Sequence, residues 1–158
     1  MKTSDPGGGG HQLSSLQDLY QQVILDHYRR PRNKGPLDGA THSVTLNNPL
    51  CGDVIDLMLR LEGKRIVAVG FEGRGCSISQ ASASMLGGLL EGRRVNEALH
   101  IMETFTRMLR GDTEAAADPD LGDLRALAGV SRFPVRVKCA LLAWNCLEKM
   151  IGPSEPVP

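Results

Sequence analysis

The 158-residue sequence has no excess of charge of either sign and no long apolar run. Its 18 basic side chains balance 18 acidic ones, so the formal net charge is zero. Nucleic-acid-binding domains normally carry a basic excess or stripe, and the balance argues against such a partner. Charged residues also interrupt every apolar stretch well before the ~20 residues that a membrane-spanning helix requires. We therefore expect a protein that binds neither nucleic acid nor a membrane.

The sequence also lacks a secretory signal and a Cys-x-x-Cys pair. Residues 1–10 contain a run of glycines but no apolar segment, so they do not have the pattern of an export signal. We therefore expect a cytoplasmic protein, in a compartment that keeps thiols reduced. Four cysteines in that setting indicate metal or sulfur chemistry more than disulfides. Without a Cys-x-x-Cys pair, the usual zinc-finger and thioredoxin patterns are excluded.

Length and composition predict one folded domain with short tails. Hydrophobic residues make up 41% of the chain, which is enough at this length to bury a core. We expect a single domain over residues 14–151, between a disordered tail at 1–13 and a C-terminal tail at 152–158.

Hydrophobic periodicity predicts an α+β fold. Three consecutive strand patterns without intervening helices indicate an antiparallel meander, with a tight hairpin turn at 62–64. The expected strands cover residues 40–47, 54–62 and 65–72. The expected helices cover residues 13–30, 77–90, 95–110, a short segment at 121–128, and 134–151. We predict a three-stranded antiparallel sheet with helices packed on one face and a metal site at one exposed end.

Three cysteines and one aspartate form the candidate site. Cys51 and Asp53 flank a glycine that lets the backbone bend, so the thiol and the carboxylate can face one point. Cys76 opens a predicted helix, where the helix dipole favours the thiolate, and Cys139 lies near the start of another. Three thiols and a carboxylate are sufficient for one tetrahedral zinc ion or for a small iron–sulfur cluster.

The charge and the lability of this ligand set indicate a site that can open. A zinc ion with three thiolates and one carboxylate carries a formal charge of about −2, which Arg74, Arg136 and Lys138 would partly offset. The carboxylate of Asp53 is a more exchangeable zinc ligand than a thiolate. A site that can open is better suited to a reaction than to a structural role. The alternative is a purely structural zinc domain with the same ligands.

The remaining candidate ligands are interpreted as structural. Cys146 lies two helical turns beyond Cys139, roughly 10 Å along the axis, and is assigned to the core. Four side chains without a partner at metal spacing are assigned to structural roles: His27, His42, His100 and Asp26. The predicted core also includes Met85, Met102, Met108 and Trp144. The basic run at 29–34 is either a solvated helix end or a partner-docking patch.

Five segments together resemble the SufU/IscU family of iron–sulfur cluster assembly proteins, also called the NifU N-terminal family. The resemblance covers residues 16–150 and rests on the combination of segments, because no single short motif is specific enough. The segments are residues 19–28, 31–35, 48–53 (NPLCGD), 71–79 (FEGRGCSIS) and 136–144 (RVKCALLAW).

Within this family, three features are similar to SufU-type proteins and differ from IscU scaffolds. Residues 111–130 resemble the inserted segment of the SufU type. Lys138 precedes the third cysteine, where IscU scaffolds characteristically have a histidine. Residues 132–136 (RFPVR) depart from the chaperone-recognition stretch of IscU, Leu-Pro-Pro-Val-Lys. These features count against a cluster-scaffold role and against engagement of the dedicated Hsp70 chaperone.

The resemblance implies a function in sulfur transfer. SufU-like proteins bind one zinc ion through the residues matching Cys51, Asp53, Cys76 and Cys139, and they accept persulfide sulfur from the PLP-dependent cysteine desulfurase SufS. A desulfurase histidine takes a place on the zinc and frees the thiolate matching Cys51, and the residue matching Arg136 takes part in that encounter. The sulfur then passes to the SufBCD assembly machinery. The alternative is an IscU-like scaffold on which an iron–sulfur cluster is assembled.

The chemistry of the residues agrees with this implied function. A thiolate attacks the terminal sulfur of a persulfide by thiol–disulfide-type exchange. A zinc ion keeps the acceptor thiol deprotonated and protected until a ligand exchange releases it. Cys51, on a loop beside a glycine, is the thiol best placed to move out. Cys76 and Cys139, at helix starts, are the better anchors.

Overall fold

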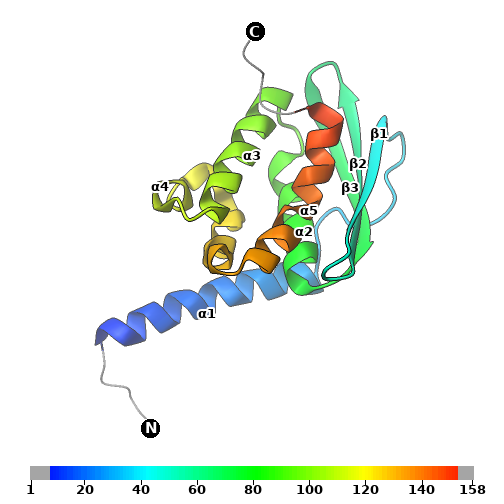
Figure 1. Cartoon of the computed structure of the whole chain (residues 1–158). Helices are drawn as coiled ribbons and strands as arrows, with labels where there is room; N and C mark the ends of the chain where they lie inside the picture. Colours follow the sequence, from blue (N-terminus) through cyan, green and yellow to red (C-terminus); the bar gives the residue numbers. More distant parts are fainter. Residues whose placement is uncertain (1–7, 153–158) are drawn as a thin grey trace.

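The three predicted strands form one antiparallel sheet. The computed structural model describes residues 8–152 and places side chains from residue 17 onward. Its strands β1 (His42–Asn48), β2 (Asp53–Glu62) and β3 (Arg65–Arg74) are paired in the order β1-β2-β3. Figure 1 shows the sheet on one side of the molecule and the helices on the other. The predicted α+β class, with an antiparallel meander and helices on one face, is therefore confirmed.

The central strand β2 alternates between fully and partly buried side chains because helices cover one face of the sheet. Ile55, Leu57 and Leu59 are fully buried and belong to the main core. This is the period of two that a strand requires when one face packs against a helical layer. The register pairs Val54 with Arg74. The start of β2 therefore lies at the sheet end where β3 leads into the next helix.

Two loops cover the outer edge of β3. The N–H of Phe71 donates to the carbonyl of Asn33 at 3.0 Å, and its carbonyl accepts from the N–H of Gly35 at 2.8 Å. Ile66 makes a similar exchange of backbone hydrogen bonds with residues 92–93. An unpaired strand edge is a template for edge-to-edge association. Here the loops take up the hydrogen-bonding groups of that edge.

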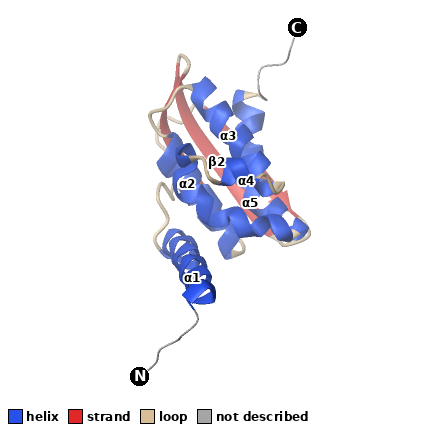
Figure 2. Ribbon diagram, turned by 90° about the vertical axis from the view of Figure 1, so that its left-hand side faces the viewer, coloured by secondary structure: helices blue, strands red, loops and turns tan. Residues whose placement is uncertain are grey.

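The helices form a layer over the buried face of the sheet (Figure 2). α2 (Ser77–Leu90) and α5 (Pro134–Ile151) pack directly on the strands, and α3 (Val95–Leu109) packs against α5 on the outside. α1 (Gly8–Arg29) packs against α2. Within residues 8–152, no helix combines the length and the apolar character that crossing a bilayer would need.

The first helix begins earlier than the sequence predicts. We expected a helix from residue 13 after a disordered tail at 1–13, whereas α1 begins at Gly8. Glycine lowers helix stability by about 1 kcal/mol relative to alanine, but it does not block a helical backbone. A run of glycines is therefore a weak boundary. Residues 1–7 and 153–158, which hold the rest of the two predicted tails, lie outside the described residues.

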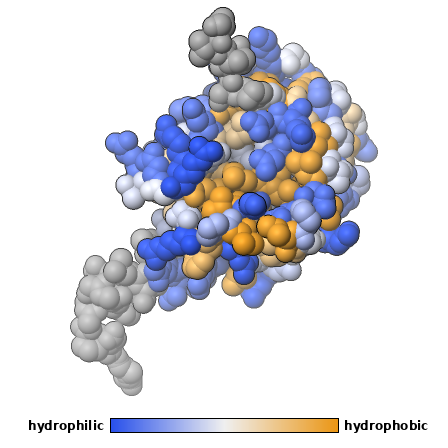
Figure 3. Space-filling model, in the orientation of Figure 1, coloured by the Kyte–Doolittle hydropathy of each residue, from blue (hydrophilic) through white to orange (hydrophobic). Residues whose placement is uncertain are grey.

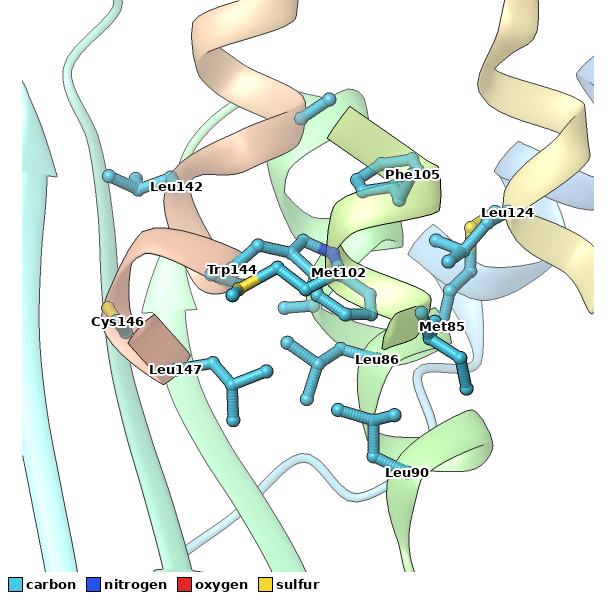
Figure 4. Close-up of a cluster of buried hydrophobic side chains, with 14 of the residues drawn as sticks. Met85, Leu86, Leu90, Met102, Phe105, Leu124, Leu142, Trp144, Cys146 and Leu147 are labelled. Carbon is cyan, nitrogen blue, oxygen red and sulfur yellow. The ribbon is translucent and has the colours of Figure 1, made fainter. Parts of the chain in front are cut away.

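Trp144 lies in the middle of the main core (Figure 4). Its ring centroid is 5.2 Å from that of Phe105 at an interplanar angle of 45°, a tilted packing that aromatic pairs favour. Its indole N–H donates to the hydroxyl of Ser82 at 3.1 Å, and that hydroxyl donates to the carbonyl of Ala140 at 2.6 Å. The other predicted core residues are also buried: Met85, Met102, Met108 and Cys146.

The segment predicted as an insertion, residues 111–130, contains α4 (Thr113–Ala116) and most of the 3-10 segment η1 (Pro119–Arg132). The short helix expected at 121–128 is part of this longer segment, which is broken at Gly122 where φ is 52°. The buried side chain of His27 in α1 connects η1 to the helical layer. Its Nε2 lies 2.8 Å from the carboxylate of Asp123, and its Nδ1 lies 2.7 Å from the hydroxyl of Ser84. His27 therefore has the structural role that we predicted, and it joins α1, α2 and η1.

Candidate metal centre

The four predicted ligands come from four parts of the chain that meet at one end of the sheet. Cys51 lies in the turn between β1 and β2, and Asp53 is the first residue of β2. Cys76 follows β3 as the N-cap of α2, and Cys139 lies in the second turn of α5. This end of the sheet is opposite the hairpin between β2 and β3 (Figure 1).

The carboxylate of Asp53 is fully buried and holds the start of α2. Its Oδ1 accepts the backbone N–H of Cys76 at 2.8 Å, and its Oδ2 lies 3.8 Å from Cys76 Sγ. The first N–H groups of a helix have no partner within the helix, and the N-cap side chain of α2 provides none. Asp53 therefore places its negative charge where the helix dipole favours it.

Gly75 makes this close approach possible. Its φ is 142°, and a Cβ atom at this position would lie 2.1 Å from Asp53 Oδ1. A side chain there would push the carboxylate away from the N–H of Cys76. Gly52 has a different role, because its φ is 72° and the space around it is open. It gives the turn between Cys51 and Asp53 a left-handed backbone.

Cys51 and Cys139 are in direct contact, with their Sγ atoms 3.2 Å apart. Buried Asn48 joins the Cys51 turn to α5, because its carbonyl accepts the N–H of Gly52 at 2.8 Å while its side-chain amide faces Cys139 Sγ at 3.8 Å. The sequence analysis included Asn48 only in the segment 48–53 that resembles the family, and it missed this contact. The available signal was an Asn at the start of a Pro-containing turn, where its side chain commonly bonds the local backbone.

The spacing of the donor atoms fits a single metal ion. One donor atom from each of Cys51, Asp53 and Cys139 lies within 4.8 Å of the other two. Ligands of a tetrahedral zinc ion lie roughly 3.3–3.8 Å from one another, given metal–ligand bonds of about 2.0–2.3 Å. The 3.2 Å between Cys51 Sγ and Cys139 Sγ is close to that range, and the 3.8 Å from Cys76 Sγ to Asp53 lies within it. Cys76 lies outside this group of three donors and adjoins it through its contact with Asp53.

The electrostatics of the site also suit a cation. Cys51 is exposed, Cys76 is half-buried and Cys139 is fully buried. Burial raises the pKa of the Cys139 thiol far above its usual range, and hydrogen bonding with Asp53 and Cys51 and the charge of Cys76 raise it further. A divalent metal at this point would reverse the effect and stabilise the thiolates.

The three cations expected to offset the charge of the site are all exposed. Arg74, Arg136 and Lys138 form no ion pair with any part of the chain that the structure describes. Exposed cations interact with the site through solvent and are screened by salt. They are better placed to meet a partner than to neutralise the ligands.

Arg136 lines a groove beside the metal centre. The groove has a volume of about 470 Å³ and runs between α1, α2, η1 and the start of α5. Ser77 and Ile78, directly after Cys76, line it as well, so the groove borders the ligand end of α2. Its rim is apolar in part, since Phe133 is 58% exposed. Figure 3 shows apolar surface gathered in the middle of the helical side of the molecule.

The basic run at residues 29–34 is partly neutralised within the protein. Arg32 donates to the carboxylate of Asp26 at 2.9 Å, and Arg30 pairs with the same carboxylate. The hydrogen bonds from Arg32 and from Arg30 lower the pKa of Asp26. Two of the cations in this run are therefore engaged at their own helix end, which favours a solvated helix end over a docking patch.

Residues interpreted as structural lie apart from this centre, with one difference from the prediction. Burial raises the pKa of Cys146 to about 11, in keeping with a core thiol, and His42 is exposed on β1. His100, predicted to have no partner ligand, has a donor atom within 4.8 Å of donors from Asp118 and Asp120. Folding of η1 against α3 brings these residues together, which sequence spacing could not reveal. The group is largely exposed, and such surface groups are common without a bound ion.

Comparisons with known proteins agree with this geometry. Residues 19–140 match the family described as the NifU-like N terminal domain. The chain is 47% identical over 142 residues to the zinc-dependent sulfurtransferase SufU of Bacillus subtilis (strain 168), covering 90% of this chain and 95% of that protein. It is 45% identical over 139 residues to the iron–sulfur cluster assembly scaffold protein IscU of Streptococcus pyogenes serotype M1, covering 88% and 86%. A solved structure, the putative iron–sulfur cluster assembly scaffold protein for the SUF system of Fervidobacterium islandicum AW-1, is similar with 32% identity and a TM-score of 0.72, covering 84% and 96%.

Gly75→Ala is expected to weaken zinc binding by about 10- to 100-fold, because the new Cβ would displace the carboxylate of Asp53. Competition with a chromophoric zinc chelator measures the affinity. The matched control is Gly63→Ala, at a hairpin glycine with φ of 61° and open space around it. That variant suffers left-handed backbone strain without the collision and should keep its zinc affinity. An unchanged affinity in Gly75→Ala would show that the position of Asp53 does not control metal binding.

Proposed function

The chain belongs to the NifU-like N-terminal domain family, and we propose that it is a zinc-dependent sulfur acceptor and transfer protein. It takes persulfide sulfur from a PLP-dependent cysteine desulfurase of the SufS type and passes it to iron–sulfur cluster assembly machinery of the SufBCD type. The Bacillus relative, named a zinc-dependent sulfurtransferase, supports this function. We place the reaction in the cytoplasm, where the four free cysteines would stay reduced.

The observation that carries the proposal is the unequal exposure of three thiols around one buried carboxylate. Cys51 is exposed, and its neighbour Leu50 is 66% exposed, so a partner can reach this turn. Cys139 and the carboxylate of Asp53 are fully buried. A purely structural zinc site has no need of an accessible ligand, whereas an acceptor needs one reachable thiol and other ligands that stay in place.

Sulfur transfer to Cys51 proceeds by thiol–disulfide-type exchange. Cys51 Sγ attacks the terminal sulfur of the partner's persulfide, the sulfur–sulfur bond breaks, and the partner's cysteine leaves as a thiolate. Cys51 then carries the persulfide. A zinc ion held by Cys51, Asp53, Cys76 and Cys139 would keep these thiols deprotonated and protected from oxidation. The left-handed Gly52 gives the Cys51 turn a backbone that can move the acceptor toward a partner.

The alternative function is an IscU-like scaffold, because three thiolates and a carboxylate also suit a small iron–sulfur cluster. The Streptococcus relative bears that name. Lys138 favours transfer, since IscU scaffolds characteristically have a histidine here, and an ammonium group has no lone pair with which to bind a metal. The segment at residues 111–130 also favours transfer, because it resembles the inserted segment of the SufU type.

Cys51→Ser is expected to stay folded and to lose sulfur acceptance, because the hydroxyl replaces the one exposed thiol among the four cysteines. The assay incubates the protein with a SufS-type desulfurase and 35S-cysteine and counts label bound to the protein. Cys146→Ser, which removes a buried core thiol, is the matched control and should accept sulfur like the wild type. Equal labelling of Cys51→Ser and wild type would contradict the proposal, and loss of the folded state in Cys51→Ser would indicate a structural zinc site.

Arg136→Ala is expected to keep its zinc and to lower stimulation of the desulfurase by about 3- to 10-fold, because its exposed cation borders the groove and is not a ligand. Zinc content and desulfurase turnover are measured on the same preparation. The control is Arg132→Ala, which removes another arginine that lines the groove, from η1, and should have the smaller effect. Unchanged stimulation in Arg136→Ala would exclude this residue from the encounter.

A further inference from the structure

Cys51 and Cys139 form a pair in which one thiol is exposed and the other is buried. Their Sγ atoms are 3.2 Å apart, so an approach of about 1.2 Å would give the 2.05 Å length of a disulfide bond. Cys76 does not share this contact. It is outside the group of donors that Cys51 forms with Asp53 and Cys139, and its sulfur faces the carboxylate of Asp53 at 3.8 Å.

We propose that Cys139 is a resolving thiol that releases sulfur from Cys51 as sulfide. The inference rests on the proposed function, because the reaction starts when Cys51 carries a persulfide. It gives the protein a second activity, the reductive release of sulfide, in addition to passing a persulfide sulfur to a partner. The competing fate is transfer to an acceptor that reaches the exposed end of the persulfide first.

The step is balanced without an external reductant. Cys139 Sγ attacks the inner sulfur, Cys51 Sγ, and a bond forms between these two atoms. The bond from Cys51 Sγ to the terminal sulfur breaks, and that sulfur leaves as hydrosulfide with the electron pair of the broken bond. The two cysteine sulfurs are thereby oxidised to a disulfide, and the terminal sulfur is reduced to sulfide. Cys139 attacks as the thiolate, and the hydrosulfide keeps the proton that the terminal sulfur carried in the persulfide.

The burial of the two thiols sets the direction of attack. The added sulfur on Cys51 points toward solvent, because Cys51 is exposed and its inner side is occupied by Cys139. Exchange at sulfur needs the attacking and leaving atoms on opposite sides of the central sulfur. Cys139 meets this requirement from the interior. Being fully buried, it cannot itself collect sulfur from a partner protein.

The surrounding residues define which thiol moves. Cys139 is part of α5, and the amide of Asn48 faces its sulfur at 3.8 Å. Cys51 lies in a turn whose next residue, Gly52, has a φ of 72°. The turn can therefore bring Cys51 down onto a fixed Cys139. The resulting disulfide removes two of the four metal ligands, so the protein accepts no further sulfur until an external thiol reduces it.

Polysulfide loading of the full-length protein tests this inference. The wild type, Cys139→Ser and Cys146→Ser are treated with inorganic polysulfide and freed of excess reagent without added thiol. Sulfide release is then followed over time, and peptide mass mapping locates persulfides and disulfides. Cys146→Ser is the matched control, because it lacks another buried thiol of α5 that is outside the ligand set and keeps the contacting pair.

The expected result is one sulfide released for each Cys51–Cys139 disulfide in the wild type and in Cys146→Ser. Cys139→Ser should keep its persulfide on Cys51 and release sulfide at least about tenfold more slowly, because the intramolecular attack is lost. Release from Cys139→Ser at the wild-type rate would overturn the inference. A disulfide joining Cys51 to Cys76 in the wild type would overturn it as well, and that result needs no variant.

Loading with polysulfide separates this inference from the proposed function. If a desulfurase does not transfer sulfur to Cys51 but polysulfide-loaded protein forms the Cys51–Cys139 disulfide, the proposed function fails and the chemistry of the pair stands. If the desulfurase loads Cys51 and the persulfide persists without forming a disulfide, the proposed function stands and the resolving role of Cys139 is wrong.

Discussion

The contact between the carboxylate of Asp53 and the backbone N–H of Cys76 determines the geometry of the metal centre. It joins the first residue of β2 to the start of α2 at 2.8 Å, and it depends on the missing side chain of Gly75. Taking a carboxylate out of water is costly unless hydrogen bonds or a positive charge compensate for it. Within residues 17–152 no cationic side chain pairs with Asp53, so a metal ion is the natural counter-charge.

The centre combines ligands held by regular secondary structure with one ligand in a turn. Asp53 is the first residue of β2, Cys76 is the N-cap of α2 and Cys139 belongs to α5, whereas Cys51 lies in a turn. Thiolate ligands are also nucleophiles, and a thiol's access to a partner depends on its exposure. The exposed Cys51 is therefore the thiol that a partner can reach, whereas the buried Cys139 is a ligand that holds the site together. The thiol of Cys139 also lies directly on the interior side of the Cys51 thiol.

The sequence could predict the elements better than the contacts between them. The α2 bounds at 77–90 were predicted without error, because a run of small residues that ends before Gly92 has a local helical pattern. The extent of η1 was missed, since its stability comes partly from the contact of Asp123 with His27, 96 residues away. For the candidate site, Cys51, Cys76, Cys139 and Asp53 were predicted from residue type and from family resemblance, and three of them, Cys51, Asp53 and Cys139, lie within 4.8 Å of one another. The roles of Asn48 and Gly75 were missed, because they depend on how β1, β3 and α5 meet.

The central claim is that three thiols and one carboxylate hold a zinc ion for sulfur transfer, and metal analysis of the freshly purified protein tests it most directly. Elemental analysis and the visible absorption spectrum should be recorded on one sample handled without chelators. One zinc ion per chain, without colour or acid-labile sulfide, is the predicted result. Iron with acid-labile sulfide and a brown spectrum would contradict the claim and identify a cluster scaffold on the same ligands.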